Sequence, residues 1–199
     1  MAVTVSAAVE GDVDEAVVRR LIVEAGAQPG PVYGKGGKAA LRAKINGYNN
    51  AARHAPWLVV VDLDGDAECA PPLREIWIPA PAPWLCFRVV VRQIEAWLMA
   101  DAESLAAYLG IAARRIPTAP ETLDNAKAAM VTLARRSRKR NMQYDMVPRE
   151  GGGRSVGPAY TSRLIEYATS RWRPRVAAAR SESLRRAMAR LERLVEETS

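Results

Sequence analysis

The hydrophobic pattern of the chain centres on five consecutive apolar residues, 57–61, which lead directly into three aspartates at alternate positions. A continuous β-branched run of this length indicates a strand that is buried on both faces, as in the middle of a parallel sheet. Two further apolar runs, residues 3–9 and 85–91, are separated from it by residues with helical spacing. The pattern therefore predicts an α/β fold, with a small parallel sheet and helices on both faces.

Weaker patterns predict the remaining elements. Helical spacing of apolar residues is found over residues 12–26, 121–136, 158–170 and 181–197, and Ser181 is the expected cap of the last helix. Two short strands are expected at residues 29–33 and 75–78. We therefore expect an α/β domain over residues 1–110 and a basic helical extension packed on it over residues 111–199.

Candidate chemistry begins where the central run ends. Asp62 and Asp64 are two residues apart, so in an extended backbone their side chains point the same way. Two carboxylates so close repel each other unless a cation lies between them, and Mg²⁺ or Mn²⁺ suits oxygen ligands best. In open α/β sheets ligands bind at the carboxyl edge of the strands. The alternative interpretation is a solvated turn rich in Asp and Gly.

A second acid follows the first apolar run. Glu10-Gly11 comes directly after it, and Asp12 begins the next helix, with Asp14 and Glu15 in the first turn, where the helix dipole favours acids. If the two strands are parallel neighbours, Glu10 and the aspartates meet at one edge of the sheet. A structure in which Glu10 turns away into a helix cap would argue against a metal site.

Val9-Glu10-Gly11 before a helix, followed by Asp62-Leu63-Asp64 after a later strand, resembles a Toprim domain. This is the metal-dependent core of bacterial primases, type II and IA topoisomerases, OLD-family nucleases, recombination mediators and a ribosomal-RNA maturase. The whole chain is similar to a family of small Toprim-like bacterial proteins, often encoded beside an ATPase in the manner of anti-phage defence modules. Residues 91–101, 157–160 and 181–185 carry this narrower match.

The resemblance implies roles for individual acids. Glu10 would be the general acid/base or the first metal ligand, Asp62 and Asp64 would bind metal, and Asp66 and Glu95 are candidates for a second ion. A helix-surface glutamate paired with Arg92 is the alternative for Glu95.

The implied function is a Mg²⁺- or Mn²⁺-dependent nuclease acting on DNA or RNA, as the effector of a defence module. A non-catalytic scaffold that partners an ATPase is the alternative.

Charge is distributed unevenly along the chain. Residues 1–100 hold 10 Lys and Arg against 11 Asp and Glu, whereas residues 101–199 hold 19 against 11. This layout is expected when an acidic metal site acts on a polyanion held by a basic flank. The alternative is an arginine-rich composition that simply makes helix surfaces basic. The expected nucleic-acid contacts are Lys35, Lys38, Arg92, Arg135, Arg136, Arg138, Lys139 and Arg140.

Composition excludes several other classes of site. His54 is the only histidine, which excludes metal sites built from several histidines. The two cysteines suggest neither a disulfide framework nor a zinc site, so a reducing cytoplasm is the expected location. No apolar run approaches the roughly 20 residues that a membrane span needs, and no signal peptide is expected.

Overall fold

A computed structural model describes residues 2–151 and 153–199, and it confirms the predicted α/β fold. All four strands run parallel, in the order β2-β1-β3-β4. Their bounds are β1 Thr4–Val9, β2 Gln28–Gly34, β3 Trp57–Asp62 and β4 Leu85–Val90. The three apolar runs of the sequence are therefore β1, β3 and β4, and β3 is buried because β1 and β4 flank it.

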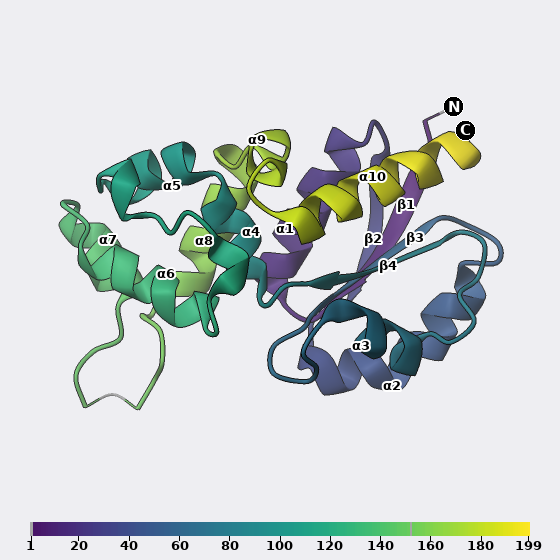
Figure 1. The fold of residues 1–199 in the computed structure, drawn as a ribbon, viewed down its shortest axis with the longest axis horizontal. Coiled ribbons are helices and arrows are strands. Elements are labelled where there is room, and N and C mark those ends of the chain that lie inside the picture. The colour runs from purple at the N-terminus through teal and green to yellow at the C-terminus, as the bar shows by residue number, and fades with distance from the viewer. Residues whose placement is uncertain (1, 152) are drawn as a thin grey trace.

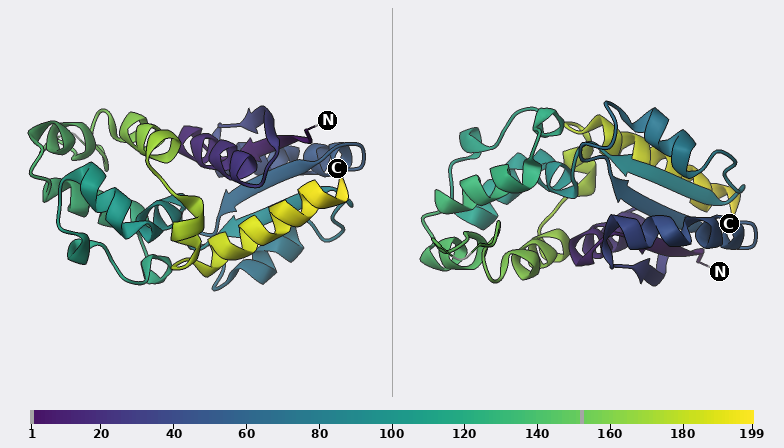
Figure 2. Two further views of the ribbon diagram at one scale, coloured as in Figure 1. Left: turned by 90° about the horizontal axis from the view of Figure 1, so that it is seen from above. Right: turned by 90° about the horizontal axis from the view of Figure 1, so that it is seen from below.

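Helices cover both faces of the sheet, as predicted (Figures 1 and 2). On one face lie α1 (Asp12–Glu24) and α10 (Glu182–Glu197), and on the other lie α2 (Gly37–Ala51) and α3 (Ala70–Trp77). Each face has its own hydrophobic cluster. Val60 belongs to the first cluster and Val59 and Val61 to the second, so alternate residues of β3 supply the two sides of the core.

A helical lobe lies beyond the carboxyl edge of the strands (Figure 1). Its helices are α4 (Ile94–Ala100), α5 (Ala102–Leu109), α6 (Ala126–Arg135), α7 (Arg140–Met146), α8 (Tyr160–Ser170) and α9 (Pro174–Ala178). Short 3₁₀ turns occur at Ala113–Arg115 and Pro120–Thr122. Trp97 and Trp172 are fully buried where the lobe meets the sheet domain, and Trp97 Nε1 donates to Ser183 Oγ of the segment that begins α10 (2.7 Å).

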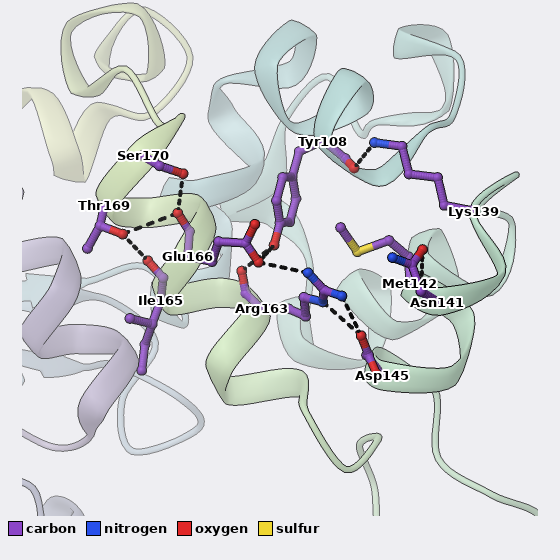
Figure 3. A network of polar contacts seen from close by, with 10 residues as sticks. All are labelled: Tyr108, Lys139, Asn141, Met142, Asp145, Arg163, Ile165, Glu166, Thr169 and Ser170. Carbon is purple, nitrogen blue, oxygen red and sulfur yellow. Dashed lines mark hydrogen bonds and ion pairs between the residues drawn. The ribbon is translucent and has the colours of Figure 1, made fainter.

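Polar contacts inside the lobe join three of its helices (Figure 3). Arg163 of α8 donates to Asp145 of α7 (2.7 Å) and to Glu166 one turn further along α8 (2.8 Å). The Tyr108 hydroxyl of α5 donates to the same Glu166 carboxylate (3.0 Å). Each of these side chains has its partner inside the lobe, so the contacts are structural.

The structure corrects two expectations about elements. Residues 75–78 do not form an edge strand, because Ala70–Trp77 is helical, with Pro71 in its first turn. Leu73 and Trp77 lie one turn apart and are both buried, which is helical rather than strand spacing. The helix expected over 121–136 begins only at Ala126, with Asn125 as its cap. The predicted cap of the last helix is confirmed, because Ser181 Oγ accepts from the N–H of Leu184 (3.2 Å).

The second half of the chain contributes directly to the core of the sheet. Leu184 and Leu191 of α10 share a hydrophobic cluster with Val60 and Val90 of the central strands. The chain therefore returns after the helical lobe to complete one layer of the α/β sandwich. Within residues 2–151 and 153–199, no helix has the length and apolar character that crossing a membrane requires.

Candidate functional site

The strand order defines where a ligand site is expected. The chain leaves β1 toward β2 on one side and later returns to place β3 on the other side of β1. Such a switch point opens a crevice between the carboxyl ends of the two strands. Glu10 follows β1 and Asp62 ends β3, and Glu10 Oε1 accepts a hydrogen bond from the backbone N–H of Asp62 (2.8 Å). The structure thus brings these two predicted residues together.

Asp14 of α1 is a further member of this group, and sequence reasoning missed it. It is 7% exposed, and the charges that raise its pKa come from Glu10 and Glu95. The sequence contains a signal, because Asp14 lies on the same helical stripe as Val17, Val18 and Leu21, all of which are buried. An acid on an apolar stripe points inward, so its position in the first turn does more than complement the helix dipole.

The carboxylates lack sufficient partners. Asp14 Oδ1 and Asp62 Oδ1 are buried and form no hydrogen bond in the described part of the chain. Burial, followed by repulsion from Glu10, raises the pKa of Asp14 to about 7. Burial, followed by repulsion from Asp14 and Glu10, holds the pKa of Asp62 well above its ordinary value. Burial also raises the pKa of Glu10, although the N–H of Asp62 and the charge of Lys38 oppose this. The group therefore needs a proton or a cation.

Glu95 lies at the side of this group nearest the helical lobe. It is 2% exposed, it accepts a hydrogen bond from the Tyr160 hydroxyl of α8 (3.0 Å), and Lys127 Nζ lies 3.9 Å away. The alternative of a helix-surface glutamate paired with Arg92 is wrong. Arg92 Nη1 instead donates to the backbone carbonyl of Asp64 (3.0 Å).

Asp64 and Asp66 already have a cation. Lys38 Nζ of α2 lies 2.7 Å from Asp64 Oδ2 and 2.9 Å from Asp66 Oδ2, and Gln93 Nε2 donates to Asp64 Oδ1 (3.1 Å). The expectation that Asp62 and Asp64 point the same way assumed an extended backbone. That backbone ends with β3 at Asp62, and Asp64 has a φ of 49°. Asp64 therefore reaches Lys38, while Asp62 Oδ1 has no partner.

The predicted nucleic-acid contacts differ in availability. Lys35 pairs with Glu15 (2.9 Å), and Lys139 Nζ donates to the carbonyls of Ala107 and Tyr108 (3.1 and 2.8 Å), the second of which Figure 3 shows. Both ammonium groups therefore have internal partners. Residues 135–140, which we call the basic run, contain four further predicted contacts. These are exposed, and their side chains form no ion pair among the described residues: Arg135, Arg136, Arg138 and Arg140.

The oxygen atoms of this group of carboxylates suit a divalent cation in their chemistry but not yet in their spacing. Within residues 2–151 and 153–199, no group of three or more His, Cys, Asp and Glu is arranged so that it could hold a metal ion. The chemistry of the group does suit Mg²⁺ or Mn²⁺, because its ligands are carboxylate oxygens and two of them are buried without partners. The residue types therefore suit Mg²⁺ or Mn²⁺. To be bound by all three carboxylates, an ion would have to draw Glu10, Asp14 and Asp62 closer together.

Comparisons of the chain with protein-family models, with curated proteins and with solved structures found no match. We define the carboxylate group as Glu10, Asp14, Asp62 and Glu95.

Proposed function

We propose that the protein is a Mg²⁺- or Mn²⁺-dependent enzyme that hydrolyses phosphodiester bonds in nucleic acid. The observation that carries this proposal is the pair of buried, unpartnered oxygens, Asp14 Oδ1 and Asp62 Oδ1, at the switch point of a parallel sheet. Burying carboxylates without partners is unfavourable, so a cation bound there would stabilise the fold. A hard divalent cation is the partner that such oxygens prefer.

The residues of the group have separate roles in this proposal. Asp62 and Asp14 would hold the ion, which would neutralise phosphate oxygens and activate water when bound. Glu10 accepts the N–H of Asp62, which fixes its orientation beside them. Burial raises the pKa of Glu10, which makes its carboxylate a better proton acceptor and suits it to the role of general base. Tyr160 and Lys127 hold Glu95 against the same group from the helical lobe.

Asp64 and Asp66 have a different role from the metal ligation that the Toprim resemblance implies. They position Lys38, whose charge also acts on Glu10. A lysine held by two aspartates at the mouth of the site is suited to orient an incoming phosphate. The resemblance to Toprim-like proteins encoded beside an ATPase extends the proposal to an effector of an anti-phage defence module.

The proposal is tested with labelled single- and double-stranded DNA and RNA, incubated with the purified protein and either Mg²⁺ or Mn²⁺. Cleavage by the wild type is expected, and Asp62→Asn and Asp14→Asn should abolish it because each removes one ligand charge. Asp12→Asn is the matched control, since Asp12 is exposed on the same helix as Asp14. Equal cleavage by Asp62→Asn and the control would refute the proposal.

A non-catalytic scaffold that partners an ATPase is the second candidate function. The observation in its favour is that Lys38 already neutralises two of the predicted metal ligands, Asp64 and Asp66. Thermal melting separates the candidates, because metal that binds only the folded state raises its melting temperature. A shift with Mg²⁺ or Mn²⁺ in the wild type that is much smaller in Asp62→Asn supports the enzyme. Equal shifts in both proteins support the scaffold.

A further inference from the structure

A groove lies along the open edge of the sheet, remote from the basic run of residues 135–140. It is a cavity of about 580 Å³ bounded by α3, β4 and α10, and we call it the β4 groove. In Figure 1, β4 lies between α10 above it and α3 below it. No strand pairs with the outer side of β4 among the described residues. The N–H of Trp57 donates to the Trp84 carbonyl and that of Leu63 to the Val90 carbonyl, so alternate residues of β4 face β3. The backbone groups of Phe87 and Val89 between them face the groove.

The β4 groove is strongly basic. Its charged lining contains no lysine and six arginines, namely Arg74, Arg88, Arg185, Arg186, Arg190 and Arg193. The two acids of the lining have internal roles. Glu182 pairs with Arg185 and Arg186 (2.7 and 2.6 Å), and Glu121 accepts the N–H groups of Glu182 and Ser183 at the start of α10 (3.0 Å each). Positive charge therefore remains in excess.

Three of these arginines have no carboxylate partner in the part of the chain that the structure describes, and Arg190 lies at 3.5 Å from Glu197. Arg88 is the most informative of them. It extends from the edge strand itself, and its Nε is buried without a hydrogen-bond partner. Burial lowers the pKa of Arg88, and the charges of Arg74, Arg186 and Arg190 lower it further. A buried guanidinium among like charges requires an anion to become favourable.

We propose that the β4 groove binds the phosphodiester backbone of a single nucleic-acid strand and leads it to the carboxylate group. This inference rests on the proposed function, because it names the strand that the enzyme would hold. The planar guanidinium fork binds phosphate through two parallel hydrogen bonds, so the arginines of the lining suit a phosphodiester backbone.

Continuity with the candidate site favours nucleic acid over an acidic protein strand. Val91 lines one end of the groove, and the next two residues, Arg92 and Gln93, both contact Asp64 beside the carboxylate group. A strand that followed the arginines would therefore arrive at the switch point.

A single strand fits the groove better than a duplex, because one phosphate must reach Arg88, whose guanidinium is partly buried. The lining also contains the apolar residues Ala70, Pro71 and Ala189, which can contact bases but offer no polar group to read their sequence. Binding is therefore expected to depend on the backbone and to tolerate any sequence.

The experiment measures binding of labelled oligothymidylate and oligouridylate in EDTA, where no cleavage can occur. Arg190→Gln with Arg193→Gln is the principal variant, because Arg193 is exposed and Arg190 is half-buried on α10, so their loss should not prevent folding. Affinity should fall about tenfold for each lost phosphate contact, and the dependence of affinity on salt should become shallower. Arg88→Gln should weaken binding as well. Arg114→Gln with Arg115→Gln is the matched control, which removes the same charge from the exposed 3₁₀ turn at Ala113–Arg115 and should change binding far less.

Several results would overturn the inference. These are unchanged affinity in the α10 variant, a larger loss in the control, or duplex binding as tight as single-strand binding with equal dependence on Arg88. Polyglutamate that binds the wild type through these arginines, while oligonucleotide binding ignores them, would show that an acidic protein strand occupies the groove. Binding in EDTA separates this inference from the proposed function: lost cleavage in Asp62→Asn supports the enzyme whether or not the groove binds, and groove binding stands even if no cleavage is found.

Discussion

Individual acids at the switch point show how burial changes the behaviour of a carboxylate. Asp12 and Asp14 are two residues apart on α1, yet Asp12 is exposed and Asp14 is 7% exposed. Burial, followed by the charges of Glu10 and Glu95, raises the pKa of Asp14 to about 7 from its ordinary value of 3.8. This difference makes the stability of the metal-free protein depend on pH in a direction opposite to that of a salt-bridged aspartate.

The prediction at this scale concerns Asp14→Asn. Between pH 3.8 and about 7 the folded state binds more protons at Asp14 than the unfolded state does, so the free energy of unfolding falls as the pH rises. The variant has no carboxyl group to titrate there, so it avoids this fall in the free energy of unfolding. At neutral and higher pH it should be more stable than the wild type by about 1–2 kcal/mol. Urea denaturation in EDTA at a series of pH values measures it. Asp12→Asn should keep the slope of the wild type, and an identical slope in all three proteins would contradict the prediction.

The ends of neighbouring elements position the site. Gly34 ends β2 beside Val9, the last residue of β1, and the N–H groups of Lys35 and Gly37 donate to the carbonyls of Val9 and Glu10 (both 2.9 Å). Gly34 has a φ of +90°, and an added Cβ would lie 2.2 Å from the Val9 carbonyl oxygen. Close approach of these two strand ends, which only glycine permits, therefore holds the backbone of Glu10.

At the element scale we predict opposite effects of two Gly→Ala substitutions. Gly34→Ala should destabilise the protein by about 2–4 kcal/mol, because the methyl group clashes with backbone and the φ is unfavourable. Gly47→Ala is the matched control: it lies inside α2, it is exposed, and an added Cβ meets nothing within 4 Å. It should stabilise by up to about 1 kcal/mol, through helix propensity. Thermal or urea unfolding of both variants measures this, and a neutral Gly34→Ala would mean that the two strand ends can separate.

The whole molecule is held together by segments that are distant in sequence. One hydrophobic cluster joins β3 and β4 to α10, and the buried Tyr160 of α8 donates to Glu95 of α4 (3.0 Å). Asp101, which is fully buried, accepts hydrogen bonds from Arg173 (2.9 and 2.6 Å) and thereby links the junction of α4 and α5 to the segment that begins α9. The helical lobe and α10 are thus parts of the same core that supports the sheet.

At this scale we predict that residues 1–110 do not fold alone. Without α10 one face of the sheet would expose Val60 and Val90, and each buried aliphatic side chain contributes about 1.5–3 kcal/mol of transfer free energy. The isolated fragment should lack a cooperative thermal transition and fixed near-ultraviolet circular dichroism, both of which the full chain should show. As a control, residues 111–199 are added as a separate chain, to see whether the transition and the circular dichroism signal recover. A sharp transition in the fragment by itself would establish residues 1–110 as an independent domain.

The amino-acid sequence by itself determined the layers of the fold. Burial on both faces requires the continuous apolar runs of β1, β3 and β4, and amphipathic helices require apolar residues at helical spacing, so these patterns are visible without coordinates. The sequence predicted that Glu10 and Asp62 meet only if their strands are parallel neighbours, and the pairing of β1 with β3 in the structure fulfils that condition. The edge strand expected at residues 75–78 was wrong because a short apolar stretch fits a strand or a helix equally well.

Only the tertiary structure decided which charges lie together. Asp14 joins the carboxylate group because α1 packs its apolar stripe on the sheet, and Glu95 is buried because Tyr160 reaches it from a helix 65 residues further along the chain. Asp64 pairs with Lys38 instead of joining the carboxylate group, because α2 brings the Lys38 ammonium group to 2.7 Å from Asp64 Oδ2. The β4 groove forms because α10, at the end of the chain, packs beside the edge strand β4. Hydrophobic periodicity is a local property that a sequence displays, whereas the partner of a charged side chain depends on which elements the packing of the layers brings side by side.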